Sequence, residues 1–575
     1  MAKVDGVTAR VLQARLSGIV RRMQDAIFRT GYSTIVRESQ DASAMILDAS
    51  GQVVGEHVIL PLHVSALPEV VAAIRGRYGE AIAPGDGFIT NHPYEAGVTH
   101  AMDMAVAVPI WVEGELLGWC ANIAHKSDLG GVVPGSANGN AREAFQEGVL
   151  YPPVRLWHQG RLVREVADIL RANSRTPDLV MGDLQGQYGT ALLGVEAVRA
   201  LCARYGVEAV KAAFEWVQAY SEARLRAAIA SWPDGIGEGE SWLEMGEEAA
   251  VRFHVRVAKG GRGLRFDFSG CSDQVASPIN INPAVARGCI YYALVATVDP
   301  TLPNNGGVAR VVEPVFRPGS VVAPRFPAPT NTYMSAACAL TEAILAALGA
   351  FVPGQRLAAT GGVGGLTIGG RRRDGTPFVC YETIGSAYGA HPGGDGCSGV
   401  SVLLSNTLTA PIEILESEFP LRLRRFALRP DSGGPGQWRG GLGMVREYEI
   451  LAPEAQLTLR GGKHQLPAEG IDGGRSGGPG ALWVTHGGQT RSHPCRISGV
   501  QLESGDLVRL EKAGGGGVGS PAARDRKALA LDILDGYVSE AAAVEVYGAS
   551  RQWVAQVRAA WEAGEPLPLE GTDGG

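Results

Sequence analysis

The feature that most constrains the fold is a pair of apolar segments in the first quarter of the chain. Residues 104–112 and 116–124 are apolar, and the polar turn Glu113-Gly114-Glu115 separates them. This pattern predicts a β-hairpin of two buried strands. Because a hairpin brings the outer ends of its strands together, the segments just outside it, residues 91–103 and 125–131, are expected to form one site.

The two flanking segments are rich in side chains that bind metal ions. They contain three of the 11 histidines, His92, His100 and His125, together with Asp103 and Asp128. Imidazole and carboxylate ligands at short spacing, completed from a neighbouring strand, hold catalytic divalent metals. We predict a metal centre with His100, Asp103 and His125 as ligands. The alternative is that these polar side chains only cap turns beside the glycines.

His92 and Asp128 are candidates for roles around this centre. Either side chain could fix the tautomer of a metal ligand or move a proton, and either could act as a general base. The pair Gly130-Gly131, shortly after Asp128, would let the backbone approach a ligand closely.

Further candidates lie outside the two segments. Glu38 and Asp41 stand at the head of a second predicted hairpin, where they could equally be solvated strand ends. Glu147 lies in a polar loop of the length that usually shapes a pocket. His57 and His63 flank another apolar run, and we rank them lower because such a histidine is more often a packing residue than a ligand.

Composition limits the class of protein. Hydrophobic residues make up 45% of the chain and charged residues 19%, as in a soluble globular protein, and 79 glycines with 33 prolines indicate many short strands and turns. The net charge of −7 predicts no nucleic-acid surface. The eight cysteines show no paired spacing, and neither a signal segment nor an apolar run of membrane length is evident. We expect a cytoplasmic protein without membrane contact.

We expect a mixed α/β (α+β) fold of several units, because 575 residues exceed one ordinary core. Its marks are Gly-rich hairpins, a central helical block and a strand-rich C-terminal part in which Gly-Gly pairs punctuate the strands. The predicted units are an N-terminal α/β unit with the metal and catalytic site (1–235), a central α/β unit (236–410), a β-rich unit (411–520), a C-terminal helical segment (521–563) and a disordered tail (564–575).

Hydrophobic periodicity gives the individual elements. Strands are predicted at 35–47 and 52–55, and at 242–257 paired with 263–269. The Gly-rich stretches near 389–396 and 512–517 lack the Lys-Ser/Thr ending of a phosphate-binding loop, so no nucleotide site is expected. Helices are predicted at 8–29, 67–79, 162–173, 178–205, 207–229, 283–298, 335–348 and 526–547.

A set of short motifs, spread over roughly residues 5–550, resembles the hydantoinase B family. That family includes the B subunits of N-methylhydantoinase and caprolactamase, the C-terminal half of 5-oxoprolinase, and subunits of acetone and acetophenone carboxylases. The motifs are Asn91-x-Pro93-Tyr94, Gly97-x-Thr99-His100-x-x-Asp103, Ala124-His125-x-x-Asp128-x-Gly130-Gly131, Gln146-Glu147-Gly148, Gly182-Asp183-Leu184, Pro303-x-Asn305-Gly306-Gly307, Tyr381-Glu382-Thr383-x-Gly385, Asp431-Ser432-Gly433-Gly434, Arg439-Gly440-Gly441 and Arg524-Asp525.

The resemblance implies an ATP-dependent enzyme divided over two chains in a hetero-oligomer, α2β2 or similar. A hydantoinase A-type partner, akin to acetate and sugar kinases, would bind ATP-Mg and phosphorylate the amide or lactam oxygen. Water would then attack the activated carbon in the B-type chain. By position, His100, Asp103 and His125 match ligands of a zinc, manganese or iron ion, and Asp41 matches an acidic residue tied to lactam hydrolysis.

The chain departs from the family pattern at His92, where many members have Asp, and at Ala96-Gly97, where Gly-Gly is usual. An added imidazole could be a fourth ligand, so the coordination number stays open. Three functions remain: a hydrolase subunit for a hydantoin, oxoproline or lactam; a ketone carboxylase subunit; and a non-catalytic assembly subunit. The intact His/Asp set favours an enzyme. Chain length favours the hydrolase over an acetone-type carboxylase subunit, which is considerably longer, but a shorter acetophenone-type subunit fits this length too. The candidate catalytic residues are Asp41, Asp103, Asp128 and His92.

Overall fold

The predicted hairpin is the centre of the N-terminal sheet. In the computed structural model, which describes residues 5–246, 248–261 and 263–568, its two strands pair antiparallel with Asp103 opposite His125. The sheet order is β2-β1-β5-β4-β3-β6-β7. The strands are β1 (Ala42–Asp48), β2 (Val53–Val58), β3 (Gly87–Thr90), β4 (Asp103–Val112), β5 (Glu115–His125), β6 (Val154–His158) and β7 (Arg161–Leu162).

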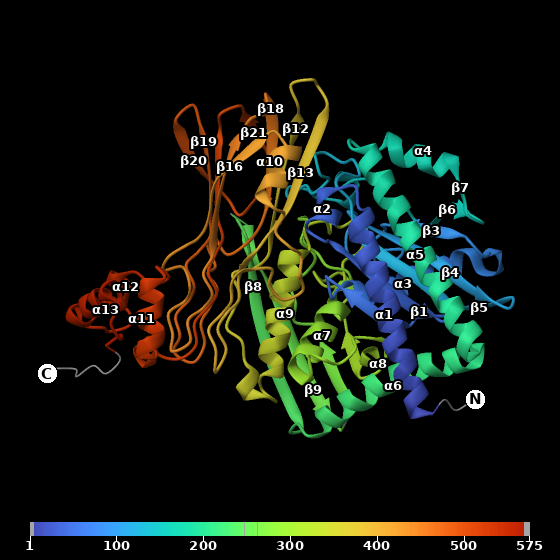
Figure 1. Cartoon of the computed structure of the whole chain (residues 1–575), viewed down its shortest axis with the longest axis horizontal. Coiled ribbons are helices and arrows are strands. Elements are labelled where there is room, and N and C mark those ends of the chain that lie inside the picture. The colour runs from blue at the N-terminus through green and yellow to red at the C-terminus, as the bar shows by residue number, and fades with distance from the viewer. Residues whose placement is uncertain (1–4, 247, 262, 569–575) are drawn as a thin grey trace.

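Helices cover both faces of this sheet (Figure 1). Alternate side chains of β1 therefore enter different cores: Ala44 and Ile46 pack toward α1 and α5, whereas Met45 and Leu47 pack toward α3. Predicted and observed helices agree closely here, apart from an earlier start of α3. The helices are α1 (Gly6–Thr30), α2 (Thr34–Arg37), α3 (His63–Tyr78), α4 (Arg164–Ala172), α5 (Pro177–Tyr205) and α6 (Val207–Ala230).

The strand predicted from residue 35 was wrong at its beginning, because that segment forms the short helix α2. The buried carboxylate of Asp183 in α5 accepts hydrogen bonds from the backbone N–H groups of Tyr32 and Ser33 and from the Ser33 hydroxyl. These bonds fix the chain in a turn just before α2. The extended strand β1 begins only at Ala42.

The central part of the chain pairs strands in the order β11-β10-β9-β8. The single strand predicted at 242–257 is in fact a long hairpin of β8 and β9. Glycines in β8 let helix α9 approach, because a Cβ on Gly237 or Gly239 would lie 2.1 or 2.0 Å from a helix carbonyl. The elements are β8 (Gly235–Met245), β9 (Glu248–Gly260), β10 (Gly263–Asp267), β11 (Val312–Val315), α7 (Pro283–Val298), α8 (Gly306–Ala309) and α9 (Met334–Leu348).

The strand-rich part forms a four-stranded sheet, β13-β12-β18-β21, and a five-stranded sheet, β16-β17-β22-β19-β20, around a shared core within the described residues. Strand β12, which lies with β13 in the second predicted unit, pairs with β18 of the third. The elements are β12 (Gly364–Arg371), β13 (Pro377–Ile384), β14 (Ser386–Ala387), β15 (Ser398–Val400), α10 (Ile412–Glu418), β16 (Leu421–Leu428), β17 (Met444–Ile450), β18 (Glu454–Arg460), β19 (Ala481–His486), β20 (Gln489–His493), β21 (Arg496–Glu503) and β22 (Leu507–Glu511).

Several Gly-Gly pairs that the sequence suggested as punctuation instead lie inside a bundle of extended segments, seen in Figure 1 between the β-rich sheets and the C-terminal helices. Segment 512–519 is its centre. A Cβ on Gly514, Gly515 or Gly516 would lie 1.8–2.0 Å from a carbonyl oxygen of another segment. Backbone hydrogen bonds join residues 514–517 to Ala359, Ala390, Gly434, Gly441, Ile471, Arg475 and Gly478.

The single C-terminal helix predicted at 526–547 was wrong, because Gly536, at φ 73°, and the new N-cap at Ser539 divide it. Two helices form within it, α11 (Arg526–Leu534) and α12 (Glu540–Glu545), and a third, α13 (Arg551–Ala563), follows. Of the predicted tail, residues 569–575 lie outside the described residues, and Pro568 accepts a hydrogen bond from the Trp553 ring at 2.8 Å.

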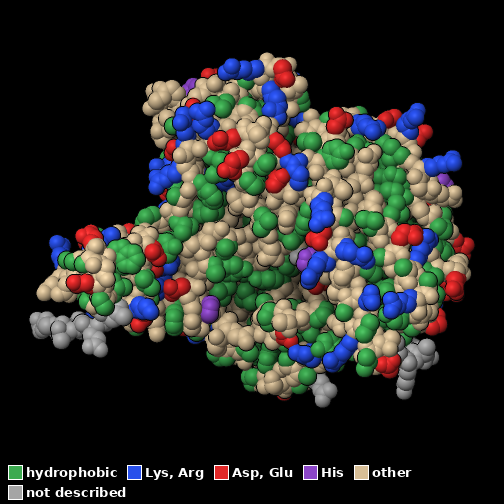
Figure 2. All heavy atoms as spheres, viewed as in Figure 1, with side chains coloured by type: hydrophobic (Ala, Val, Ile, Leu, Met, Phe, Trp, Pro, Cys, Tyr) green, Lys and Arg blue, Asp and Glu red, His purple; other side chains and the backbone are tan. Residues whose placement is uncertain are grey.

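The mixed α/β class is thus confirmed. On the face shown in Figure 2, basic and acidic side chains are interspersed. Across the residues that the structure describes, no helix has the length and apolarity that a bilayer crossing needs.

Candidate metal centre

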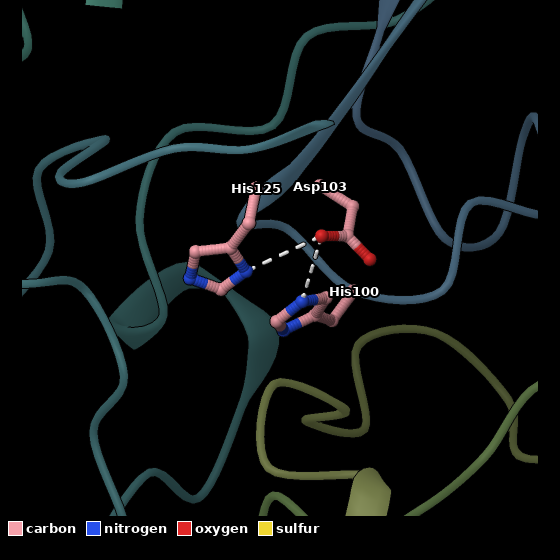
Figure 3. A group of neighbouring side chains, drawn as sticks. All are labelled: His100, Asp103 and His125. Carbon is pink, nitrogen blue, oxygen red and sulfur yellow. Dashed lines mark hydrogen bonds and ion pairs between the residues drawn. The ribbon is translucent and has the colours of Figure 1, made fainter. Parts of the chain in front are cut away.

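Three side chains converge where the hairpin ends. Asp103 begins β4, His125 ends β5 on the paired strand, and His100 lies one turn before Asp103. Asp103 Oδ1 is 3.2 Å from His100 Nε2 and 3.3 Å from His125 Nδ1, the two contacts drawn in Figure 3. All three side chains are buried. The sequence prediction that they would meet therefore follows directly from the strand register.

A neighbouring loop orients the His100 ring. His100 Nδ1 lies 2.9 Å from the carbonyl oxygen of Asn331, so Nδ1–H donates there and the other ring nitrogen, Nε2, faces Asp103. The loop is itself held by the buried carboxylate of Glu147, which accepts N–H bonds from Thr330 at 2.9 Å and Asn331 at 2.7 Å. Burial raises the pKa of Glu147 to about 8.

The second oxygen of Asp103 has its own partners. The Thr99 hydroxyl donates to Oδ2, and His63 Nε2 lies 3.4 Å away. His63, ranked low from the sequence, is fully buried, and its Nδ1 is 2.8 Å from the Ser43 hydroxyl. Burial alone would raise the pKa of Asp103, but the His100 charge and the histidine hydrogen bonds hold it well below its usual value.

Asp41 stands beside the three residues, at the start of β1. Its Oδ2 is 4.0 Å from His125 Nδ1, and its Oδ1 has no hydrogen-bond partner among the described residues. Burial and the nearby Asp103 charge raise its pKa well above the usual value. Burial also lowers the pKa of His125 to about 4, which leaves that ring neutral at pH 7, the form that binds a metal.

These residues line one wall of a small, partly open cavity of about 50 Å³. The other walls come from distant parts of the chain: the start of α9 supplies Tyr333, β13 supplies Tyr381, and β18 supplies Arg460. The Tyr381 ring packs against the His125 ring with centroids 4.4 Å apart. No local sequence pattern marks these side chains as site residues, although Tyr381 lies in the motif Tyr381-Glu382-Thr383-x-Gly385.

Comparison with known proteins shows to which family the chain belongs. The profile of the family described as Hydantoinase B/oxoprolinase matches residues 5–521. The chain belongs to this hydantoinase B/oxoprolinase family. A Pseudomonas sp. (strain NS671) protein, provisionally named as the B subunit of a D-/L-hydantoinase, is 31% identical over 95% of both chains. The beta subunit of the Pseudomonas jessenii caprolactamase is 28% identical, over 95% of this chain and 96% of its own.

Solved structures share the fold of this hydantoinase B-family chain. The crystal structure of ATP-dependent caprolactamase from Pseudomonas jessenii has a TM-score of 0.89 at 28% identity and covers 95% of this chain and 96% of its own. Nucleotide-free acetone carboxylase has a TM-score of 0.86 at 20% identity, over 97% of this chain and 83% of its own. At that identity the second likeness concerns the fold alone.

The side chains of His100, Asp103 and His125 suit a divalent metal ion. One ligand atom each from His100, Asp103 and His125 lies within 4.8 Å of the others, and in the part of the chain that is described no other group of three such side chains meets this criterion. Two imidazoles and one carboxylate without a thiolate suit zinc, manganese or iron. The Nδ1–H bond of His100 to a carbonyl is the usual support for a metal-binding histidine.

Two other predicted site residues, Asp128 and His92, lie outside the cavity of this hydantoinase B-family chain. Asp128 accepts hydrogen bonds from the N–H groups of Gly130, Gly135 and Arg175 and from the Arg175 guanidinium. His92 Nδ1 accepts the N–H groups of the two residues that follow Pro93. Neither residue lines the cavity. The geometry therefore gives no support to the general-base role considered for either residue.

Proposed function

We propose that this chain is the hydrolytic B-type subunit of an ATP-dependent cyclic-amide hydrolase. The observation that carries the proposal is the buried His100, Asp103 and His125 cluster with Asp41 beside it in one cavity. The family match, the hydantoinase-type relative and the caprolactamase structure support the reaction class. A hydantoin, an oxoproline or a lactam would be the substrate.

In this proposal His100, Asp103 and His125 hold a zinc, manganese or iron ion. A cation there supplies the positive charge that makes water a nucleophile at neutral pH. Asp41 Oδ1 takes a proton from the attacking water and delivers it to the ring nitrogen. As the C–N bond breaks, the new hydroxyl group gives up its own proton and an acyl phosphate remains, which a second water molecule hydrolyses to a carboxylate and inorganic phosphate. The Asp41 carboxylate suits this role because its Oδ1 has no hydrogen-bond partner among the described residues and its Oδ2 lies 4.0 Å from His125 Nδ1.

ATP-Mg would bind to a hydantoinase A-type partner in a hetero-oligomer, because this chain carries no phosphate-binding loop motif. The subunit names of two relatives support a divided enzyme. We expect no ATP turnover by this chain alone.

The test is ATP consumption and ring opening by the chain co-expressed with an A-type subunit. Hydantoin, 5-oxoproline and caprolactam are supplied without bicarbonate, and acetone and acetophenone with and without it. His100→Ala is compared with a control, His486→Ala, whose side chain is 62% exposed at a distant hairpin. We expect ring opening without bicarbonate, lost only in His100→Ala.

Three outcomes would contradict the proposal. ATP use only with a ketone and bicarbonate would identify a carboxylase subunit. Activity that survives removal of all metal would favour an assembly role for this chain. An unaffected His100→Ala variant would refute the metal centre.

A further inference from the structure

Arg460 is a buried cation of the cavity without a carboxylate partner. Its side chain is only 8% exposed, and it lines the same cavity as Asp41 and His125. Its Nε and Nη2 have no hydrogen-bond partner among the described residues, and none of the ion pairs found within that part of the chain includes it. A buried guanidinium that lacks such partners is costly.

The surroundings hold this guanidinium in place. It lies over the Tyr381 ring, 4.4 Å from the centroid, and Tyr381 in turn packs on His125. On the neighbouring strand β12, Gly365 stands opposite Arg460, and a Cβ there would lie 2.2 Å from Arg460 Nη2. The absent side chain of Gly365 therefore leaves the space that the guanidinium fills.

A structural role as the counter-ion of Asp41 explains this arrangement less well. The positive charge of Arg460 does act on Asp41, but the two side chains form no ion pair within 4.0 Å. A planar guanidinium with free N–H groups is instead the side chain best suited to bind an oxyanion through two parallel hydrogen bonds.

We propose that Arg460, positioned by Tyr381 and Gly365, binds the phosphoryl oxygens of the activated substrate and so places its reactive carbon beside the His100, Asp103 and His125 cluster. The inference rests on the proposed function, in which the substrate reaches this cavity with a phosphoryl group from ATP. A carboxylate carried by the substrate itself would offer related oxyanion chemistry. The two sources are separated by the choice of probe.

The test measures binding of inorganic phosphate, and separately of acetate, to the full chain by calorimetry, with and without zinc. Arg460→Gln removes the cation, Arg460→Lys keeps a charge without the planar fork, and Gly365→Ala displaces the guanidinium. Arg371→Gln is the control, because Arg371 is exposed at the far end of β12. Melting temperature and zinc content verify that each variant is folded and loaded.

We expect phosphate binding to weaken at least about tenfold in Arg460→Gln and Gly365→Ala, less in Arg460→Lys, and not at all in Arg371→Gln. Zinc content should be unchanged, and Arg460→Gln should melt no lower than wild type because the lost charge has no partner. Absent or Arg460-independent phosphate binding would overturn the inference, as would a marked loss of stability in Arg460→Gln. Arg460-dependent binding of acetate alone would overturn the phosphoryl assignment.

These results are independent of the ring-opening assay. If the complex opens rings with ATP but phosphate binding does not depend on Arg460, the proposed function stands and this inference is refuted. A chain that binds phosphate through Arg460 in a complex that opens no cyclic amide would refute the proposed function, and with it the cyclic amide as the group that is phosphorylated.

Discussion

Replacing Thr99 by Val tests whether Asp103 is a metal ligand. The Thr99 hydroxyl donates to Asp103 Oδ2, so that Oδ1 is left to face His100 and His125. Valine has nearly the same shape and removes only the hydroxyl, so packing should be kept. The variant therefore removes a hydrogen bond that holds the Asp103 carboxylate and leaves the proposed ligand side chains unchanged.

The structure sets the size of the effect. A hydrogen bond to a charged group contributes about 1.5–3 kcal/mol. The Oδ2 atom would keep a second neighbour, His63 Nε2 at 3.4 Å, so the loss should fall within the range for supporting residues of metal sites. We expect metal affinity to drop by about 10–100-fold, or about 1.4–2.7 kcal/mol.

The assay is competition for zinc and manganese against a chelator of known affinity, with bound metal quantified by mass spectrometry. The matched control is Thr341→Val, a buried threonine whose hydroxyl donates to the Ala337 carbonyl within α9 at 2.8 Å. An affinity within threefold of wild type for Thr99→Val, or an equal loss in Thr341→Val, would refute the assignment of Asp103.

Three further changes test other parts of the molecule. Asp41→Asn should slow ring opening at least about 100-fold while metal content is kept; equal rates would exclude it as the base. Burial raises the pKa of Glu147 from 4.5 to about 8, so the folded state keeps a proton that the unfolded state has lost, and wild type should lose stability as pH rises from about 5 to 8. Denaturant titrations of Glu147→Gln should show a weaker pH dependence, and an identical one would contradict this. Gly516→Ala would put a Cβ 2.0 Å from the Glu469 carbonyl and should abolish soluble expression, whereas Gly18→Ala, on an open helix surface, should melt at or above the wild-type temperature.

The sequence predicts the part of the site whose residues lie close together along the chain. Residues 104–124 specify a hairpin, and the hairpin register alone places Asp103 opposite His125. His100 follows because it lies one turn away. Most long helices were also predictable, since their apolar positions repeat over many turns.

The rest depends on contacts between distant segments. Arg460 and Tyr381 reach the cavity through pairing within the β13-β12-β18-β21 sheet, which no local pattern specifies. His63 resembled a packing residue because its one informative neighbour, Asp103, is 40 positions away. Asp128, by contrast, was predicted as a site residue because it follows His125 closely in the sequence. Its carboxylate instead accepts hydrogen bonds from the N–H groups of its own loop and of Arg175.

The bundle around segment 512–519 has a consequence for how the protein is made. Its neighbours, including Ala359, Gly434 and Gly478, leave the ribosome well before this segment, which supplies their backbone hydrogen-bond partners. Residues 42–125, which carry the side chains of the proposed metal centre and strands β1 to β5, are synthesised much earlier and can pair among themselves. We therefore expect the part of the cavity formed by residues 42–125 to fold early during translation. The wall that contains Arg460 is expected to pack against it only once synthesis is almost complete.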